Sequence, residues 1–127
     1  MPPLEPFAYA VLRVVPDAAR GEAVNAGVVL FCRGRRYLKL LAAAPEVKLR
    51  ALNPAFDLEA LRGHLRILEA VAAGDGAGGP VASGEQSARF HWLVAPSSTM
   101  VQPSEVHTGL CADPEEQTRR LFGQLVL

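Results

Sequence analysis

The stretch Phe7-Ala-Tyr-Ala-Val-Leu-Arg-Val-Val15 and the run Val24-Asn-Ala-Gly-Val-Val-Leu-Phe-Cys32 decide the fold of this chain. Both are rich in β-branched and aromatic residues, and the first stops at Pro16-Asp17, so each is typical of a strand. The link between them is about eight residues long, which is too short for the crossover that parallel strands need. We therefore predict that the two strands pair as an antiparallel hairpin.

Further strands are predicted on either side of a central helical region. Arg33-Gly-Arg35 is typical of a tight turn, and Arg36–Leu41 resumes as a third strand. Downstream, the sequence favours two strands at Phe90–Val94 and Thr99–Gln102, joined by a turn at Pro96–Ser98 and closed by Pro103. Val106–Leu110 is predicted to extend the sheet.

Three helices are predicted from apolar spacing and capping residues. Glu46–Leu52 forms a short helix that ends before Asn53-Pro54, because proline disfavours the α conformation of the residue before it. Residues 58–71 carry apolar side chains at spacings of three and four, after Asp57 as the N-cap. A C-terminal helix follows Asp113, which an N1 proline and a capping-box glutamate support.

These elements predict an α+β fold: a mainly antiparallel sheet of about five strands with helices packed mostly on one face. Residues 1–127 are expected to form a single domain, in which residues 72–88 form a mobile, glycine-rich loop. This loop contains Gly74-Asp-Gly-Ala-Gly-Gly79, which matches the letters of a dinucleotide-binding motif. Because it follows a helix and not a strand, the motif lacks the context that phosphate binding needs.

Composition excludes several classes of protein. The 13 basic and 13 acidic side chains leave no net charge to attract nucleic acid or an anionic membrane. No signal peptide and no membrane-spanning run is recognised, so we expect a cytoplasmic protein without a membrane or nucleic-acid partner. Cys32 and Cys111 are expected to be buried free thiols. His64, His91 and His107 have no metal-ligand spacing, so no metal and no cofactor is predicted.

Two groups of polar residues suggest a site. Near the first hairpin, Arg13 and Arg20 can bind a phosphate or a carboxylate through two hydrogen bonds each. Glu22 can orient an arginine or act as a base, and Asn25 is close in the sequence. Pairing within the structure explains the same residues without a ligand. The basic cluster of Arg33, Arg35, Arg36 and Lys39 is interpreted as a solvated hairpin tip and not as a nucleic-acid site.

Two blocks of sequence carry a resemblance. Arg20-Gly-Glu-Ala-Val-Asn-Ala-Gly-Val-Val-Leu30 and Val101-Gln-Pro-Ser-Glu-Val-His-Thr-Gly-Leu110 resemble the bacterial family known as domain of unknown function 3037, over nearly the whole chain. The resemblance implies a shared site of unassigned activity, made of Arg13, Arg20, Glu22, Asn25, Gln102, His107 and Thr108, with Arg89 as a companion. It also implies an accessory or regulatory role beside kinase-like proteins of the HipA type.

Two functions remain open at this point. The first is a small non-catalytic binding or regulatory module, whose partner is a kinase-like protein or a second copy of the chain, and whose interface is the apolar part of the sheet that helices leave uncovered. The second is a small enzyme or ligand-binding domain for a phosphorylated or carboxylated metabolite, with Glu22 or His107 as acid or base. The second requires the two polar blocks to meet in space.

Overall fold

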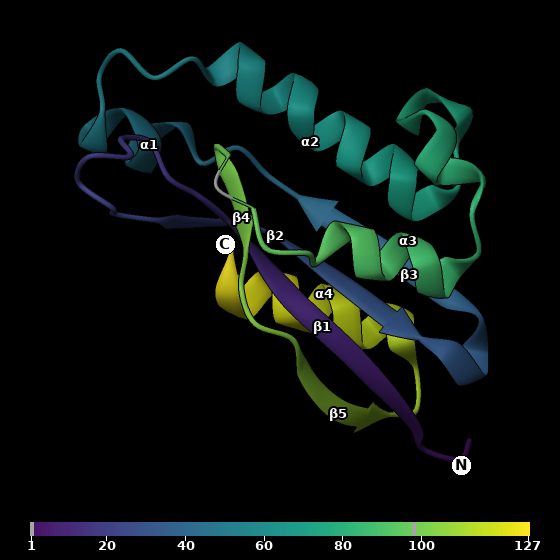
Figure 1. Ribbon diagram of the computed structural model, residues 1–127. Coiled ribbons are helices and arrows are strands. Elements are labelled where there is room, and N and C mark those ends of the chain that lie inside the picture. The colour runs from purple at the N-terminus through teal and green to yellow at the C-terminus, as the bar shows by residue number, and fades with distance from the viewer. Residues whose placement is uncertain (1, 98) are drawn as a thin grey trace.

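The computed structural model describes residues 2–97 and 99–127, and within them five strands form one antiparallel sheet between helices (Figure 1). The predicted α+β class is confirmed. The strands are β1 (Glu5–Val14), β2 (Val24–Cys32), β3 (Tyr37–Ala42), β4 (Val101–Pro103) and β5 (His107–Cys111), and the α-helices are α1 (Glu46–Leu52), α2 (Leu58–Ala73), α3 (Gln86–Leu93) and α4 (Pro114–Leu125).

The central strand of the sheet is β1, which has partners along both sides. On one side it pairs with β2, from Ala8 opposite Phe31 to Val14 opposite Val24, which confirms the predicted hairpin. The other side is shared, because β5 pairs with residues 5–9 of β1 and β4 pairs with residues 12–14. The strand β3 pairs with β2 and forms one edge of the sheet, while β4 and β5 together form the other.

Between β4 and β5 a serine continues the pairing with β1. The backbone N–H of Ser104 donates to the carbonyl of Val11 at 2.8 Å, and the Ser104 hydroxyl accepts from the N–H of Val11 at 2.9 Å. The side chain thus does what a backbone carbonyl would do in a continuous strand. The N–H and C=O of Val11 are both satisfied although the edge strand is interrupted there.

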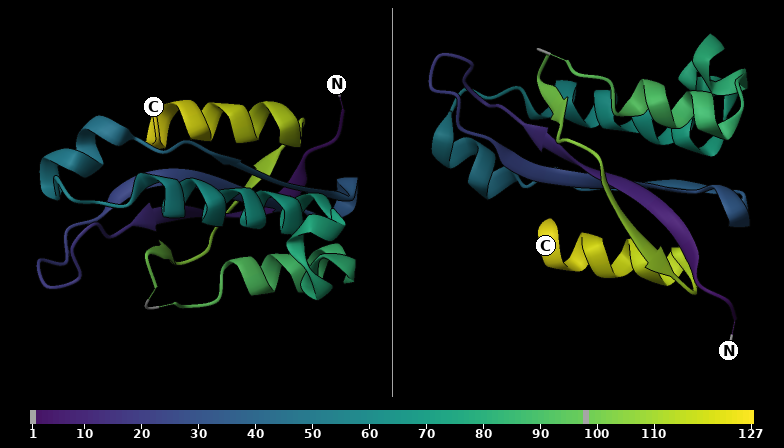
Figure 2. Two further views of the ribbon diagram at one scale, coloured as in Figure 1. Left: turned by 90° about the horizontal axis from the view of Figure 1, so that it is seen from above. Right: turned by 60° about the horizontal axis from the view of Figure 1, so that its bottom comes forward.

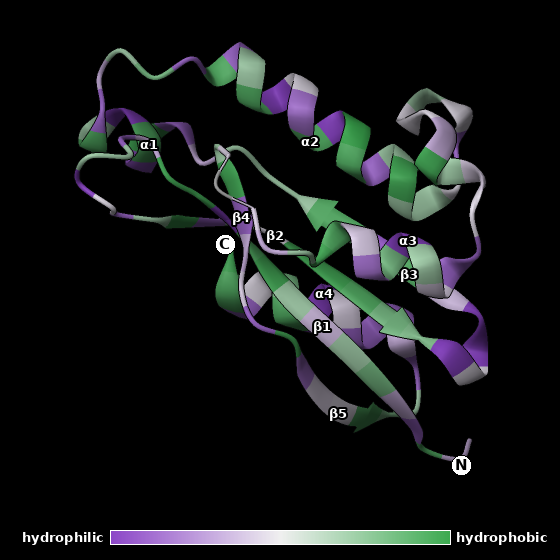
Figure 3. Ribbon diagram, viewed as in Figure 1, coloured by the Kyte–Doolittle hydropathy of each residue, from purple (hydrophilic) through white to green (hydrophobic). Residues whose placement is uncertain are grey.

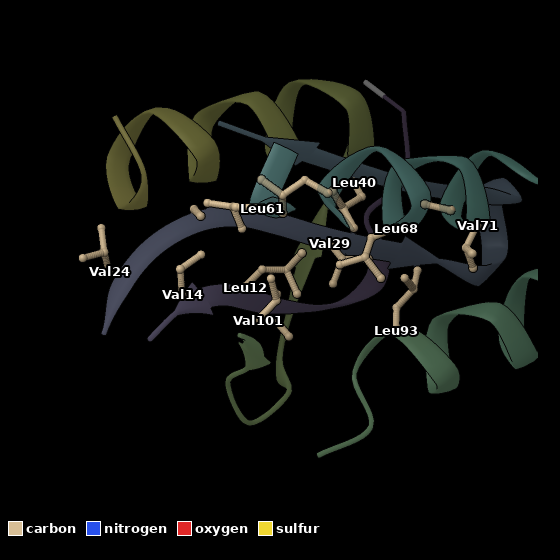
Figure 4. Packing of buried hydrophobic residues seen from close by; sticks show 14 of the residues in the cluster. Leu12, Val14, Val24, Val29, Leu40, Leu61, Leu68, Val71, Leu93 and Val101 are labelled. Atoms are coloured by element: carbon tan, nitrogen blue, oxygen red, sulfur yellow. The ribbon is translucent and has the colours of Figure 1, made fainter. Parts of the chain in front are cut away.

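Helices cover both faces of the sheet (Figure 2). The larger core lies between the sheet and α1, α2 and α3, and Figure 4 shows part of it, including Leu12, Val29, Leu61 and Leu68. On the opposite face α4 packs on β2 and β3. Because β2 is covered on both faces, it is buried along nearly its whole length. Its sequence is accordingly an almost continuous run of hydrophobic residues (Figure 3). The smaller core under α4 contains Phe7, Val28, Leu30, Cys32, Cys111, Leu121 and Val126.

The helix α2 begins and ends at residues that the sequence indicates. The Asp57 carboxylate accepts a hydrogen bond from the N–H of Ala60 at 3.0 Å, which confirms the predicted N-cap. Gly74 ends the helix with a φ of 72°, a left-handed conformation that favours glycine. No helix among the described residues is long and apolar enough to cross a bilayer.

The helix α4 is attached to β3 by a hydrogen bond between two hydroxyl groups. Asp113 caps the helix by accepting from the N–H of Glu115 and of Glu116, as predicted. One turn later, the Tyr37 hydroxyl donates to the Thr118 hydroxyl at 2.9 Å, which in turn donates to the Pro114 carbonyl at 2.7 Å. Thr118 is fully buried, so these bonds satisfy a polar group that has no access to water.

One predicted strand is wrong. Residues 90–93 of the predicted strand Phe90–Val94 lie in the helix α3, where Phe90 and Leu93 are three positions apart and both buried. The ring of Phe90 stacks on that of Phe31 in β2, with 5.3 Å between ring centroids. The aromatic residues that suggested a strand therefore pack a helix against the sheet. Their local preference for β structure is overridden by these tertiary contacts.

The neighbouring predictions need smaller corrections. The strand expected at Thr99–Gln102 forms at Val101–Pro103, and its proline is tolerated on an edge strand. The turn predicted at Pro96–Ser98 includes Ser98, which lies outside the described residues. Within the predicted loop of residues 72–88, the chain forms two short 3-10 turns, Gly76–Gly78 and Pro80–Ser83, and α3 already begins before the loop was expected to end.

Alkaline pH is expected to destabilise the fold through Tyr37 and Cys111. Burial raises the pKa of the Tyr37 hydroxyl, and burial together with the nearby Cys32 raises the pKa of the Cys111 thiol. The folded protein therefore keeps both groups neutral to a higher pH than the unfolded chain does. Their contribution to stability is complete below the ordinary pKa values, about 8.5 for cysteine and about 10 for tyrosine. It is lost as the pH rises through the folded pKa values.

Urea denaturation over a pH series measures this effect. The free energy of unfolding should be level between about pH 7 and pH 8 and fall above that range. In the double variant Tyr37→Phe, Cys111→Ala the alkaline fall should be shallower. An unchanged slope in the double variant would show that other groups cause the loss.

Removing the Ser104 hydroxyl is expected to destabilise the sheet at its centre. In Ser104→Ala the buried N–H of Val11 loses its acceptor, which should cost about 1–3 kcal/mol of the free energy of unfolding. A matched control is Ser83→Ala, because Ser83 is exposed and its hydroxyl bonds only the nearby Pro80 carbonyl. The control should change stability by less than about 0.5 kcal/mol. Equal effects in the two variants would refute the bridging role.

Candidate functional site

The two polar blocks meet across the sheet at Arg13. In register, Arg13 of β1 lies opposite Asn25 of β2 on one side and opposite Gln102 of β4 on the other. Residues directly opposite one another in antiparallel strands project to the same face. We call Arg13, Asn25 and Gln102 the polar row. It lies on the face that α4 covers, because Asn25 bonds to that helix.

Within the polar row, Asn25 has a structural role. Its side-chain N–H donates to the carbonyl of Leu125 at 2.9 Å and so satisfies an acceptor at the end of α4. The pairing of β1 with β2 is irregular between Leu12 and Arg13, and this shift in register turns Asn25 toward the helix. In contrast, the Arg13 side chain is exposed, and Gln102 bonds only locally, to the carbonyl of Thr99 at 3.1 Å.

His107 lies on the same face as the polar row but farther along β1. It pairs with Tyr9, and the two rings lie 5.3 Å apart between centroids. Its Nε2 is 3.7 Å from a carboxylate oxygen of Glu105, and its side chain is 46% exposed. Tyr9 and Arg13 are four residues apart, or about 13 Å along the strand. His107 therefore shares an open surface with Arg13 without contacting it.

Arg20 and Glu22 lie apart from His107. They pair with each other in the exposed loop between β1 and β2. Glu22 lies next to the Val14 end of β1, which is about 17 Å along the strand from Tyr9, the partner of His107. Their backbone positions thus do not bring Glu22 and His107 to one reacting group.

The remaining candidates, Arg89 and Thr108, lie outside the polar row. Arg89, on α3, donates to the carbonyl of Gly84 at 2.6 Å and to that of Ala72 at 3.4 Å, and so ties α3 to the end of α2. This is a packing role in the layer on the other face of the sheet. Thr108 is an exposed residue of β5 opposite Ala8, and the alternation of the strand turns it away from the face that holds His107.

Two residues of the same blocks were not among the candidates, although the structure gives them clear roles. One is Ser104, which bridges to Val11. The other is Gly109, where an added Cβ would lie 2.8 Å from the Phe7 ring, so the glycine leaves room for that ring. A glycine inside a strand is a recognisable signal of close approach. Nothing in the local sequence marks the serine.

The strand β5 is exposed on both faces. His107, Thr108 and Leu110 are exposed, and the large apolar side chains of Val106 and Leu110 are 43% and 62% accessible. Alternation of hydrogen bonds also leaves the N–H and C=O groups of Thr108 and Leu110 pointing to the free edge, because His107 and Gly109 face β1. This segment therefore offers apolar, polar and backbone contacts together.

Metal ligands and thiols are the other groups that could carry chemistry in this fold. Within residues 2–97 and 99–127, no group of three or more His, Cys, Asp or Glu side chains could hold a metal ion. Cys32 and Cys111 are both free and buried, as the sequence predicts. A raised pKa keeps the Cys111 thiol protonated, which opposes reactivity as a nucleophile.

Comparison with known proteins identifies a family. No curated protein matches the chain, and no solved structure matches it either. A family model does match, from residue 9 to residue 126, which covers nearly the whole chain and both blocks that meet across β1. The chain therefore belongs to the family described as Protein of unknown function (DUF3037).

Proposed function

We propose that this protein is a small non-catalytic binding module that contacts a partner protein through β5 and the adjoining face of β1 and β4. The observation that carries the proposal is the exposure of β5. Both helix layers pack against β2 and β3, whereas β5 contacts chiefly β1 (Figure 2). Residues 107, 108 and 110 are left in solvent at a free edge of the sheet.

The chemistry of this surface fits a protein partner. Val106 and Leu110 supply exposed apolar area, and the edge supplies unpaired backbone groups of the kind to which an extended segment of another chain can pair. Thr108 adds an exposed polar group on the face of β5 that holds Leu110, and Arg13 and His107 add exposed polar groups on the opposite face. Protein interfaces commonly combine apolar side chains, arginine and other polar groups of this kind.

The first partner to test is a kinase-like protein of the HipA type, which the resemblance of the sequence blocks implies. A second copy of the chain is the other candidate, since an edge strand can also pair with its own copy. The competing hypothesis, an enzyme with Glu22 and His107 acting together, loses support from their separation along β1.

An affinity pull-down tests the proposal. The tagged full chain is recovered from its own cells and the retained proteins are quantified by mass spectrometry. A partner in near-equal amount is expected. Leu110→Glu should reduce its recovery at least about tenfold, because a charge replaces an apolar contact in the interface. Val47→Glu is the matched control, since Val47 is 84% exposed on α1 and should leave recovery unchanged.

Two further measurements complete the test. Circular dichroism should show that both variants fold as the wild type does, because both positions are on the surface. Light scattering should report whether the partner is a second copy. A monomer that retains no partner, or a partner whose recovery Leu110→Glu does not reduce, would contradict the proposal.

A further inference from the structure

A second candidate surface lies at the turn between β2 and β3. Arg33, Arg35 and Arg36 fall within four residues there. The ion pairs found in the described part of the chain involve other arginines, namely Arg20, Arg50, Arg62, Arg119 and Arg120. Among the described residues, none of the three arginines of the turn forms an ion pair, although the Glu5 carboxylate lies against Gly34 between them.

This turn forms one wall of a hollow whose other wall is the start of α3. The hollow has a volume of about 560 Å³, which is in the range of small-molecule sites. Two of the three arginines, Arg33 and Arg36, line it, whereas Arg35 does not. The rest of its lining is Phe31, Glu85, Gln86 and Ser87, so one carboxylate also borders it.

The Arg33 guanidinium is held in position at this hollow. It lies 5.4 Å from the centroid of the Phe31 ring, and its Nη2 donates to the Ser87 hydroxyl at 3.3 Å. Phe31 itself is buried and stacked on Phe90. A guanidinium fixed by an aromatic ring and a hydroxyl loses less conformational entropy when it binds an anion.

Arg36 is held in a conformation that its residue type disfavours. Its φ is 51°, and it is the one non-glycine residue with positive φ in the described part of the chain. The side-chain N–H of Gln86, another residue of the hollow, donates to the Arg36 carbonyl at 2.8 Å and helps to fix this backbone. Glycine is the usual residue for such a position. The presence of arginine at this position is explained if its side chain binds a ligand in the hollow.

We propose that the hollow binds a small phosphorylated ligand, with the guanidinium groups of Arg33 and Arg36 on the phosphate oxygens and the Ser87 hydroxyl beside them. Guanidinium groups match the geometry of phosphate oxygens and form two bonds each. Two of them on one wall suit the multiple charge of a phosphate better than the single charge of a carboxylate. The hollow is separate from β5, so this proposal does not depend on the binding of a partner protein.

Isothermal titration of the full chain with pyrophosphate tests the proposal, and the chain offers a matched pair of variants. Arg36→Gln removes a guanidinium from the hollow, so it should weaken binding and raise the dissociation constant at least about tenfold. Arg35→Gln removes the same charge one residue away. The Arg35 guanidinium donates instead to the Pro3 carbonyl at 2.8 Å, so this variant should change the constant by no more than about twofold.

A glycine variant separates binding from folding. Arg36→Gly relieves the backbone and removes the side chain, so the melting temperature without ligand should rise, while pyrophosphate should no longer raise it further. Titration with ADP in the same way assigns the source of the phosphate. Binding tighter than that of pyrophosphate indicates a nucleotide, and weaker binding indicates a ligand without a base; both support the site.

Two results would overturn the proposal. The first is an equal loss of affinity in Arg35→Gln and Arg36→Gln, which would show that only the diffuse charge of the turn attracts anions. The second is that millimolar pyrophosphate gives no heat signal in the titration of the wild-type chain and does not raise its melting temperature.

Discussion

The structure depends on β1 having hydrogen-bond partners along both of its sides. On one side β2 supplies them without interruption apart from one shift in register. On the other side three separate pieces do so: β5, the Ser104 hydroxyl and β4. A buried strand with unsatisfied backbone groups would be costly, so the irregular segment after α3 is constrained to follow β1 closely. That constraint is what brings the second polar block next to the first.

The same pairing determines the face of the sheet to which each side chain of β1 projects. Odd-numbered positions, such as Tyr9 and Arg13, face α4, and even-numbered positions, such as Ala10 and Leu12, face the larger core. The helix α4 packs chiefly on β2 and β3 and also covers Phe7, whereas Arg13, near β4, remains exposed and Tyr9, near β5, is only half-buried. Several residues of the family blocks, among them Asn25, Ser104 and Gly109, serve the fold. Among the described residues, the side chains of Arg13 and Thr108 form no hydrogen bond or ion pair, Gln102 bonds only to the nearby Thr99 carbonyl, and His107 contacts Tyr9 and Glu105.

Much of the fold can be predicted from the sequence. The parts that could not be predicted have one cause in common, which is that they depend on contacts between distant residues. The strands β1, β2 and β3, the helices α1, α2 and α4, and the caps Asp57 and Asp113 were all predicted, because apolar spacing and capping are local signals. Residues 90–93 of the helix α3 were predicted as a strand, and the start of the helix as loop. The sequence did not reveal the helix because Phe90 is placed by its contact with Phe31, far away in the sequence. The meeting of Arg13 with Gln102 depends on the register of β1 and β4, which local patterns do not fix.

The bond between Asn25 and Leu125 joins positions that are 100 residues apart. During synthesis, the sheet face formed by Phe7, Val28 and Leu30 is made well before the helix that covers it. That face has no cover until α4 leaves the ribosome, because α1, α2 and α3 pack against the other side of the sheet. A nascent chain that has emerged only as far as β5 would therefore expose this hydrophobic face, which is a surface of the kind that chaperones bind.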